Sequence, residues 1–136
     1  MKKSIIAVIF CFMMLICVPA SVCNAKENVN TEIHLDYIYT RGISAALYCN
    51  GNSASCGLLF SPVESTSKLN GTLTLYDISA NRAVATWSVV MSNGVRSVSK
   101  NAAISKGHRY RLSFSGQVTT KGGASEHISC STEKQN

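Results

Sequence analysis

Apolar and polar residues alternate along most of the chain beyond residue 42, in short runs separated by turn-forming residues. A period of two is typical of a strand with one buried face, and no stretch carries the i, i+3, i+4, i+7 spacing of a long amphipathic helix. The alternating runs are 43–49, 56–60, 69–75, 85–91, 98–104, 110–114 and 126–130. The pattern therefore predicts an antiparallel sandwich of about seven strands.

Turn chemistry lies between these runs. Asn50-Gly51-Asn52, Asn93-Gly94 and Lys121-Gly122-Gly123 offer residues that tolerate positive φ, and Pro62 ends the second run. The strand count and length match an immunoglobulin-like Greek-key sandwich. We therefore expect an all-β domain of this class, preceded by a signal-peptide helix.

The alternation also assigns a core. The clearest run, KGHRYRLSFSG at 106–116, has one apolar face and one basic and polar face. Trp87 shares its parity with Val89 and Met91, so we expect it to be buried and not to serve as a sugar-stacking platform. The expected core residues are Trp87, Tyr110, Leu112 and Phe114.

The first residues have the composition of an export signal. Lys2 and Lys3 precede an apolar run from Ile5 to Val18, and small residues lead to Ala25. This run is shorter than the roughly 20 residues of a transmembrane helix. We expect 1–25 to be a cleaved signal peptide, 26–36 a polar leader, 37–131 the β-sandwich domain and 132–136 a C-terminal tail. We expect the product to be secreted, either free in the medium or associated with the cell surface.

Charge and composition exclude few functions, but they make nucleic-acid binding a weaker hypothesis. Without residues 1–25 the chain has 136 − 25 = 111 residues, with 13 − 2 = 11 Lys and Arg against 7 Asp and Glu. This excess is spread out and is poor evidence for nucleic-acid binding. We expect no cofactor, no metal site and no stable membrane insertion after cleavage; the partner is an unknown protein or cell-envelope component.

Three cysteines remain beyond the expected signal. Cys49 and Cys56 flank the Asn50-Gly51-Asn52 turn on inward parities, so an antiparallel pair can place them opposite each other. This makes Cys49–Cys56 the preferred disulfide, with Cys130 as a buried thiol. A Cys49–Cys130 bridge and no bridge at all are the alternatives.

Two resemblances follow from particular motifs. Ile104 to Leu112 resembles the approach to the sixth strand of fibronectin type III and related domains, which implies that Tyr110 is a tyrosine-corner residue bonded to upstream backbone. Further motifs, in order, are Tyr37-Ile38-Tyr39, 51–56, Leu75-Tyr76, Trp87-Ser88, 106–111 and Ser125-Glu126. Together they resemble a group of uncharacterised small secreted β-sandwich proteins of Gram-positive bacteria, which implies a fold and a compartment but no activity.

Two surface features are candidate ligand sites. Lys106, Arg109 and Arg111 form the one basic cluster and could bind phosphate or carboxylate groups, although a solvated face with glutamate partners is the simpler interpretation. Exposed tyrosines could stack on sugars. The tyrosines expected at the surface are Tyr37, Tyr39, Tyr48 and Tyr76.

No catalytic motif is recognisable: the chain has no G-x-S-x-G, S-x-x-K or H-E-x-x-H sequence. We therefore expect a non-catalytic extracellular or cell-envelope interaction module. The alternative is a carbohydrate- or wall-polymer-binding module, distinguished by a row of exposed tyrosines on one face. A secreted hydrolase is the less favoured third hypothesis.

Overall fold

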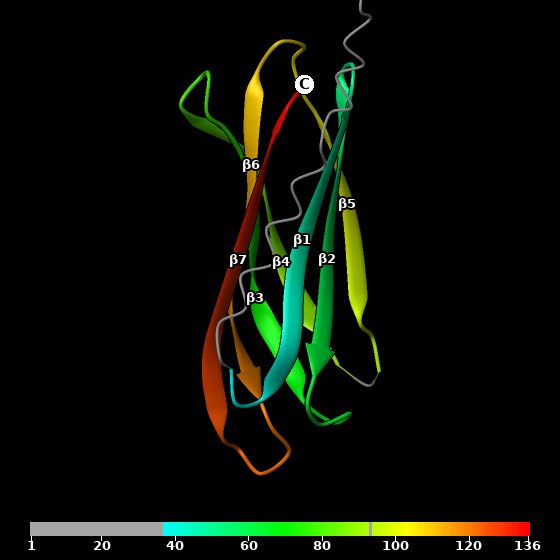
Figure 1. Ribbon diagram of the computed structural model, residues 1–136, viewed down its shortest axis with the longest axis vertical. Coiled ribbons are helices and arrows are strands. Elements are labelled where there is room, and N and C mark those ends of the chain that lie inside the picture. Colours follow the sequence, from blue (N-terminus) through cyan, green and yellow to red (C-terminus); the bar gives the residue numbers. More distant parts are fainter. Residues whose placement is uncertain (1–36, 93) are drawn as a thin grey trace, which may run out of the picture.

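The computed structural model describes residues 37–92 and 94–136 (Figure 1). The expected signal peptide (1–25), the polar leader (26–36) and Asn93 of the expected turn lie outside the described residues. The described chain forms seven strands, as the alternation predicted. They are β1 (Thr40–Asn50), β2 (Ser53–Pro62), β3 (Lys68–Asp77), β4 (Arg82–Met91), β5 (Ser97–Ala103), β6 (Arg109–Thr119) and β7 (Ser125–Gln135).

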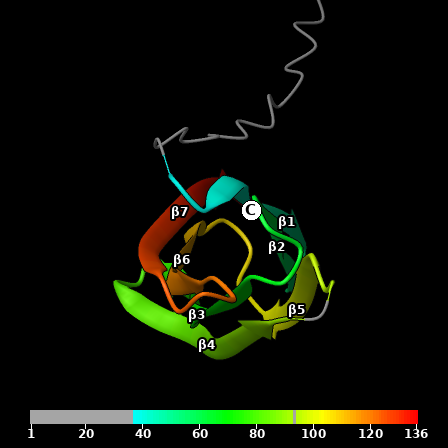
Figure 2. The ribbon, with the colours of Figure 1, turned by 90° about the horizontal axis from the view of Figure 1, so that it is seen from below.

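The strands form two antiparallel sheets that enclose one core (Figure 2). One sheet has the order β1-β2-β5 and the other β4-β3-β6-β7. The chain passes between the sheets after β2, β4 and β5. The prediction of an all-β fold with antiparallel strands is confirmed. Within the described residues no helix is long and apolar enough to cross a membrane.

The core consists of the inward residues of both sheets, as their parity predicted. Tyr110, Leu112 and Phe114 of β6 are fully buried between the sheets. The hydroxyl of Tyr110 accepts a hydrogen bond from the backbone N–H of Ser105 at 2.9 Å and donates one to the carbonyl of the same residue at 3.1 Å. Tyr110 therefore makes the upstream backbone contact that the sixth-strand resemblance implied.

Trp87 corrects the predicted core. Its side chain packs against the core but is only partly buried, whereas Val89 and Met91 on the same strand are fully buried. The parity of Trp87 was right, but β4 is an edge strand. An edge position leaves one flank of a large ring without a neighbouring strand.

The preferred disulfide is not formed. Cys49, Cys56 and Cys130 are free thiols. The β1–β2 turn pairs Asn50 with Ser53, so Cys49 lies opposite Ala54 and Cys56 lies opposite Leu47. A register two residues from the expected one places Cys49 and Cys56 diagonally, where Cβ atoms lie farther apart than a disulfide permits.

The segment expected as a C-terminal tail continues a strand. β7 extends to Gln135 and pairs with β6 through Arg109↔Gln135. The side-chain amide of Asn136 then donates to the carbonyls of Gly51 and Ser105 at 2.6 and 2.9 Å. This ladder holds the polar residues after 131 in place, although their sequence lacks an apolar face.

Candidate ligand-binding groove

A hollow of about 420 Å³ lies on the outer face of the β4-β3-β6-β7 sheet. It is lined by Thr74, Tyr76, Ile78, Asn81, Arg111 and Ser113. Outward residues of β3 and β6 form its floor, and the β3–β4 turn forms one side. We call this hollow the Tyr76 groove. It brings together an aromatic residue and an arginine that the sequence analysis had assigned to separate candidate sites.

Strand register places these two side chains next to each other. Tyr76 on β3 pairs with Arg111 on β6, which in turn pairs with Glu133 on β7. An irregularity in the β3–β4 register falls between Leu75 and Tyr76, and such bulges commonly redirect a side chain. The Tyr76 hydroxyl donates to the Asn81 side-chain oxygen at 2.6 Å. Asn81 has φ of 51°, a conformation that asparagine tolerates better than most residues.

The expected basic patch contains a carboxylate. Arg109 and Arg111 contact the two oxygens of Glu133 at 2.7 and 2.6 Å. The Arg111 hydrogen bond is the main reason that the pKa of Glu133 is below its usual value, with the Arg109 charge contributing and partial burial opposing it. Two arginines share one carboxylate, so a single net positive charge remains in this trio.

Lys106 does not belong to this patch. It lies in the β5–β6 connection, and its Cε would be 3.4 Å from a Cβ built at Gly51 in the β1–β2 turn. The alternation along β6 could not reveal the position of Lys106, because this residue lies in a connection between the two sheets and not on the strand.

Short hydroxyl side chains lie beside the groove on all four strands of the sheet. Two adjacent cross-strand rows consist only of serine and threonine. The rows are Ser88–Thr72–Ser115–Ser129 and Thr86–Thr74–Ser113–Ser131. Neighbouring strands are about 4.8 Å apart, so these rows form a dense field of donors and acceptors beside the groove. These rows cannot be recognised in the sequence, because only the strand register shows which residues are aligned.

The four surface tyrosines do not form one row. Tyr48 is 59% exposed on β1, in the other sheet, and Lys134 lies over its ring. Tyr37 and Tyr39 are partly buried against the core, which corrects their assignment as surface platforms. The Tyr37 hydroxyl donates to the Ser129 carbonyl and accepts from the Ser129 N–H. Only Tyr76 lines the groove.

The structure also contains a pair that the sequence analysis missed. Asp77 is buried, and its carboxylate accepts hydrogen bonds from the His108 ring at 2.7 Å and the Ala80 N–H at 2.9 Å. The pair ties the β3–β4 turn to the start of β6. The position of Asp77 at the start of a polar turn was the one feature of the sequence that pointed to this residue. Nothing in the sequence connects it with a histidine 31 residues later.

Two histidine contacts resemble fragments of a catalytic triad without forming one. His108 has a buried carboxylate behind it, whereas the Ser115 hydroxyl lies 3.3 Å from His127. His108 and Ser115 are seven residues apart along extended chain, roughly 20 Å. Within the described chain no serine hydroxyl bonds His108, and no group of three or more His, Cys, Asp or Glu residues is placed to hold a metal ion.

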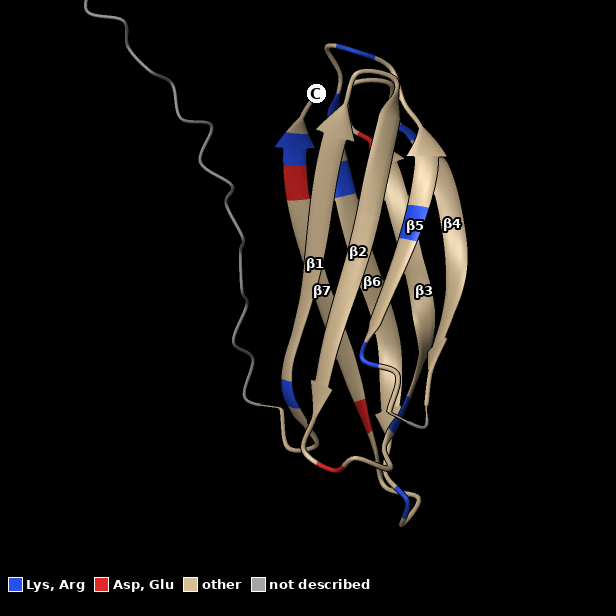
Figure 3. Cartoon of the chain, turned by 90° about the vertical axis from the view of Figure 1, so that its right-hand side faces the viewer, with Lys and Arg blue, Asp and Glu red and all other residues tan. Residues whose placement is uncertain are grey.

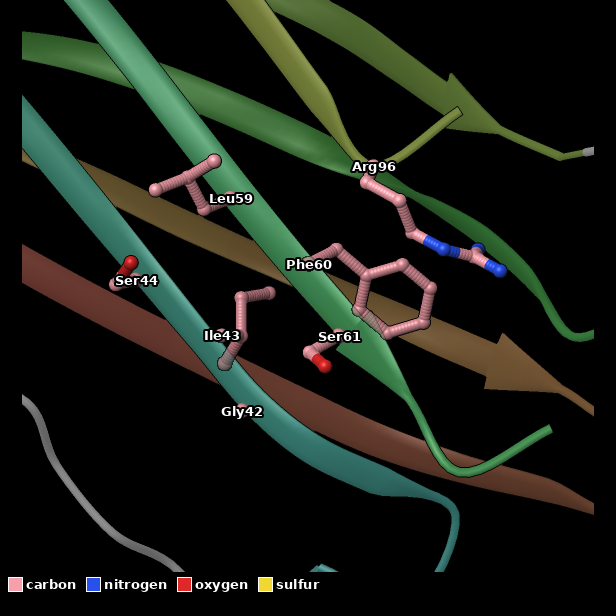
Figure 4. A pocket seen from close by; sticks show the side chains of 7 residues that line it. All are labelled: Gly42, Ile43, Ser44, Leu59, Phe60, Ser61 and Arg96. Carbon is pink, nitrogen blue, oxygen red and sulfur yellow. The ribbon is translucent and has the colours of Figure 1, made fainter. Parts of the chain in front are cut away.

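A second hollow of about 400 Å³ lies at one end of the β1-β2-β5 sheet (Figure 4). Its lining includes Leu59, which is 56% exposed, and Arg96. The Arg96 guanidinium donates to the Ser65 carbonyl at 3.1 Å, which anchors the β2–β3 connection. The Tyr76 groove combines an aromatic ring and its hydroxyl with the polar side chains of Thr74, Asn81 and Ser113, so it is the better candidate for ligand binding.

No protein-family model matches the chain, and no curated protein matches it.

Proposed function

We propose that this protein is a secreted, non-catalytic interaction module of the extracellular space or cell envelope, built on a fibronectin type III-like Greek-key sandwich. The strand orders β1-β2-β5 and β4-β3-β6-β7, with three crossings between sheets, support this topology. The backbone contact of Tyr110 with Ser105 supports it independently. The suggested relationship to small secreted proteins of Gram-positive bacteria rests on the sequence motifs.

The observation that carries the proposal is the Tyr76 groove. An aromatic ring, a guanidinium and several hydroxyls meet on an open sheet face. Such a surface offers hydrogen bonds and one apolar contact, but it has no positioned nucleophile or base. These properties favour binding over catalysis.

A carbohydrate or wall polymer is the second candidate ligand, and the groove lining favours it. Thr74, Asn81 and Ser113 provide polar groups around Tyr76, and the serine and threonine rows continue this character. Because Glu133 already pairs with both arginines, a neutral hydroxylated chain suits the groove better than a strongly anionic one.

Co-sedimentation with purified cell envelopes and with insoluble polysaccharides tests the proposal. We expect retention by the native protein and a clear loss with Tyr76→Ala. Tyr48→Ala is the matched control, because it removes an exposed tyrosine from the other sheet and should leave retention unchanged. Equal retention of all three proteins would remove the groove as the site, and no retention on any material would refute the wall-binding hypothesis.

Secretion has its own measurement. The intact mass of protein recovered from culture medium should correspond to a chain without residues 1–25. A mass that still includes them, or recovery from membranes alone, would contradict cleavage.

A further inference from the structure

Four strands form the edges of the two sheets, and three of them are protected. β5 is short, with seven residues, and contains Lys100. β1 lies along β7 (Figures 1 and 2). Short strands, charged residues and covering segments are the usual means by which natural proteins block unwanted edge pairing.

The edge of β7 is covered by the segment that precedes β1. The Tyr37 hydroxyl bonds both the N–H and the carbonyl of Ser129. The Glu126 carboxylate accepts the backbone N–H groups of Ile38 and Tyr39 at 2.5 and 3.1 Å. The segment 37–39 is thus hydrogen-bonded to Glu126 and Ser129 of β7 and covers this edge.

The fourth edge, β4, contacts β5 of the other sheet, but it is ten residues long and carries no charge after its first residue. From Ala83 to Met91 its sequence is AVATWSVVM, with no charge, proline or glycine. Figure 3 shows β4 along one margin of the molecule, and the one charged residue of the strand is Arg82 at its start. Within the described residues the only strand paired with β4 is β3, and no other hydrogen bond involves residues 83–91. Its outer backbone groups are therefore available.

The side chains on β4 are consistent with an interface. Val90 is 66% exposed, and Trp87 packs on the core yet remains only partly buried. Long, uncharged edge strands rich in β-branched and aromatic residues are the ones that pair with further strands.

We propose that β4 is a self-association edge, and that two copies of this chain pair antiparallel through it to join their four-stranded sheets. A two-fold axis at Trp87, the midpoint of 83–91, places every residue of that segment opposite an uncharged residue of the second copy. Arg82, the nearest charge, lies at opposite ends of the joined strands. The two Trp87 residues become cross-strand neighbours, an arrangement that aromatic pairs favour.

The geometry also limits assembly to a dimer. A two-fold interface uses the same edge of both copies, and β7, the other edge of each four-stranded sheet, is covered by residues 37–39. The joined sheet therefore has eight strands, and no third copy can pair with its covered edges. This inference is independent of the Tyr76 groove, which lies on the outer face of the sheet.

Sedimentation equilibrium across a wide concentration range tests the dimer. The native protein should change from monomer to dimer as concentration rises and should form nothing larger. Thr86→Lys places a charge on the exposed face of β4 and should keep the protein monomeric. Thr72→Lys, the matched control, places the same charge on the neighbouring central strand β3 and should dimerise like the native protein.

Two further measurements identify the edge. Trp87 is the single tryptophan, so its fluorescence should become less accessible to a soluble quencher as the dimer forms. Amide hydrogen exchange should slow in β4 and stay unchanged in β7. A native protein that is monomeric at every concentration, equal association of both lysine variants, or growth beyond a dimer would each overturn the proposal.

Discussion

Gly71 on β3 and Gly116 on β6 lie directly opposite each other, and the ring of Phe114 occupies the space where their side chains would be. A Cβ at Gly71 would come within 2.5 Å of the end of that ring and 2.7 Å of Gly116 Cα. The absence of side chains at the two glycines therefore leaves the space that the fully buried ring of Phe114 fills.

Adding a methyl group at either glycine should destabilise the domain. A Cβ at Gly116 would be 2.5 Å from the Asn70 carbonyl oxygen, and backbone atoms cannot move away cheaply. We expect Gly116→Ala to lower the free energy of unfolding by about 1–3 kcal/mol or more, measured by urea denaturation. Gly57→Ala is the control, since its Cβ would meet ordinary contacts at 3.6 and 3.7 Å. Equal midpoints for the two variants would contradict this account.

Removing the Tyr110 hydroxyl tests the contact with Ser105. Tyr110→Phe leaves the buried ring in place but removes the partner of the Ser105 N–H, whereas the Ser105 carbonyl keeps its hydrogen bond from the Asn136 amide. Because Ser105 is exposed and water can reach its N–H, we expect a loss of about 0.5–1.5 kcal/mol, the net contribution of an ordinary hydrogen bond. Thermal and urea unfolding should agree. A variant as stable as the native protein would show that solvent replaces the hydroxyl without cost.

Asp77 should make the stability of the domain decrease at acidic pH. Burial by itself raises the pKa of Asp77, but hydrogen bonds from His108 and Ala80, with the nearby charges of His108 and Arg82, outweigh it and bring the pKa below 3.8. A carboxyl whose pKa is lowered by folding contributes stability above its unfolded pKa, and this contribution is lost as pH falls through the folded pKa. Unfolding midpoints measured from pH 7 to pH 2 should therefore fall less in Asp77→Asn than in the native protein. Parallel curves would exclude Asp77 as a source of the acid sensitivity.

The three thiols should react in a defined order. Burial raises the pKa of Cys56 and Cys130 to about 11, with the Cys49 thiolate adding to the effect at Cys56, while Cys49 is only partly buried and its pKa is raised as well. Since the thiolate is the reactive form, alkylation of the native protein should modify Cys49 first and the other two only after unfolding. Peptide mapping without reduction should recover three alkylated cysteines. A Cys49–Cys56 or Cys49–Cys130 peptide would contradict the free thiols.

The sequence by itself determined the number of strands, the face that each strand buries and the burial of Tyr110, Leu112 and Phe114. These follow from a period of two, which is a local property of the chain. Tertiary structure decided which strands are neighbours and in which register. Register separated Cys49 from Cys56, joined Tyr76 to Arg111 and aligned the hydroxyl rows, because each depends on residues far apart in sequence. Sheet order left Trp87 half-buried, since parity identifies the inward face but not whether a strand lies at an edge.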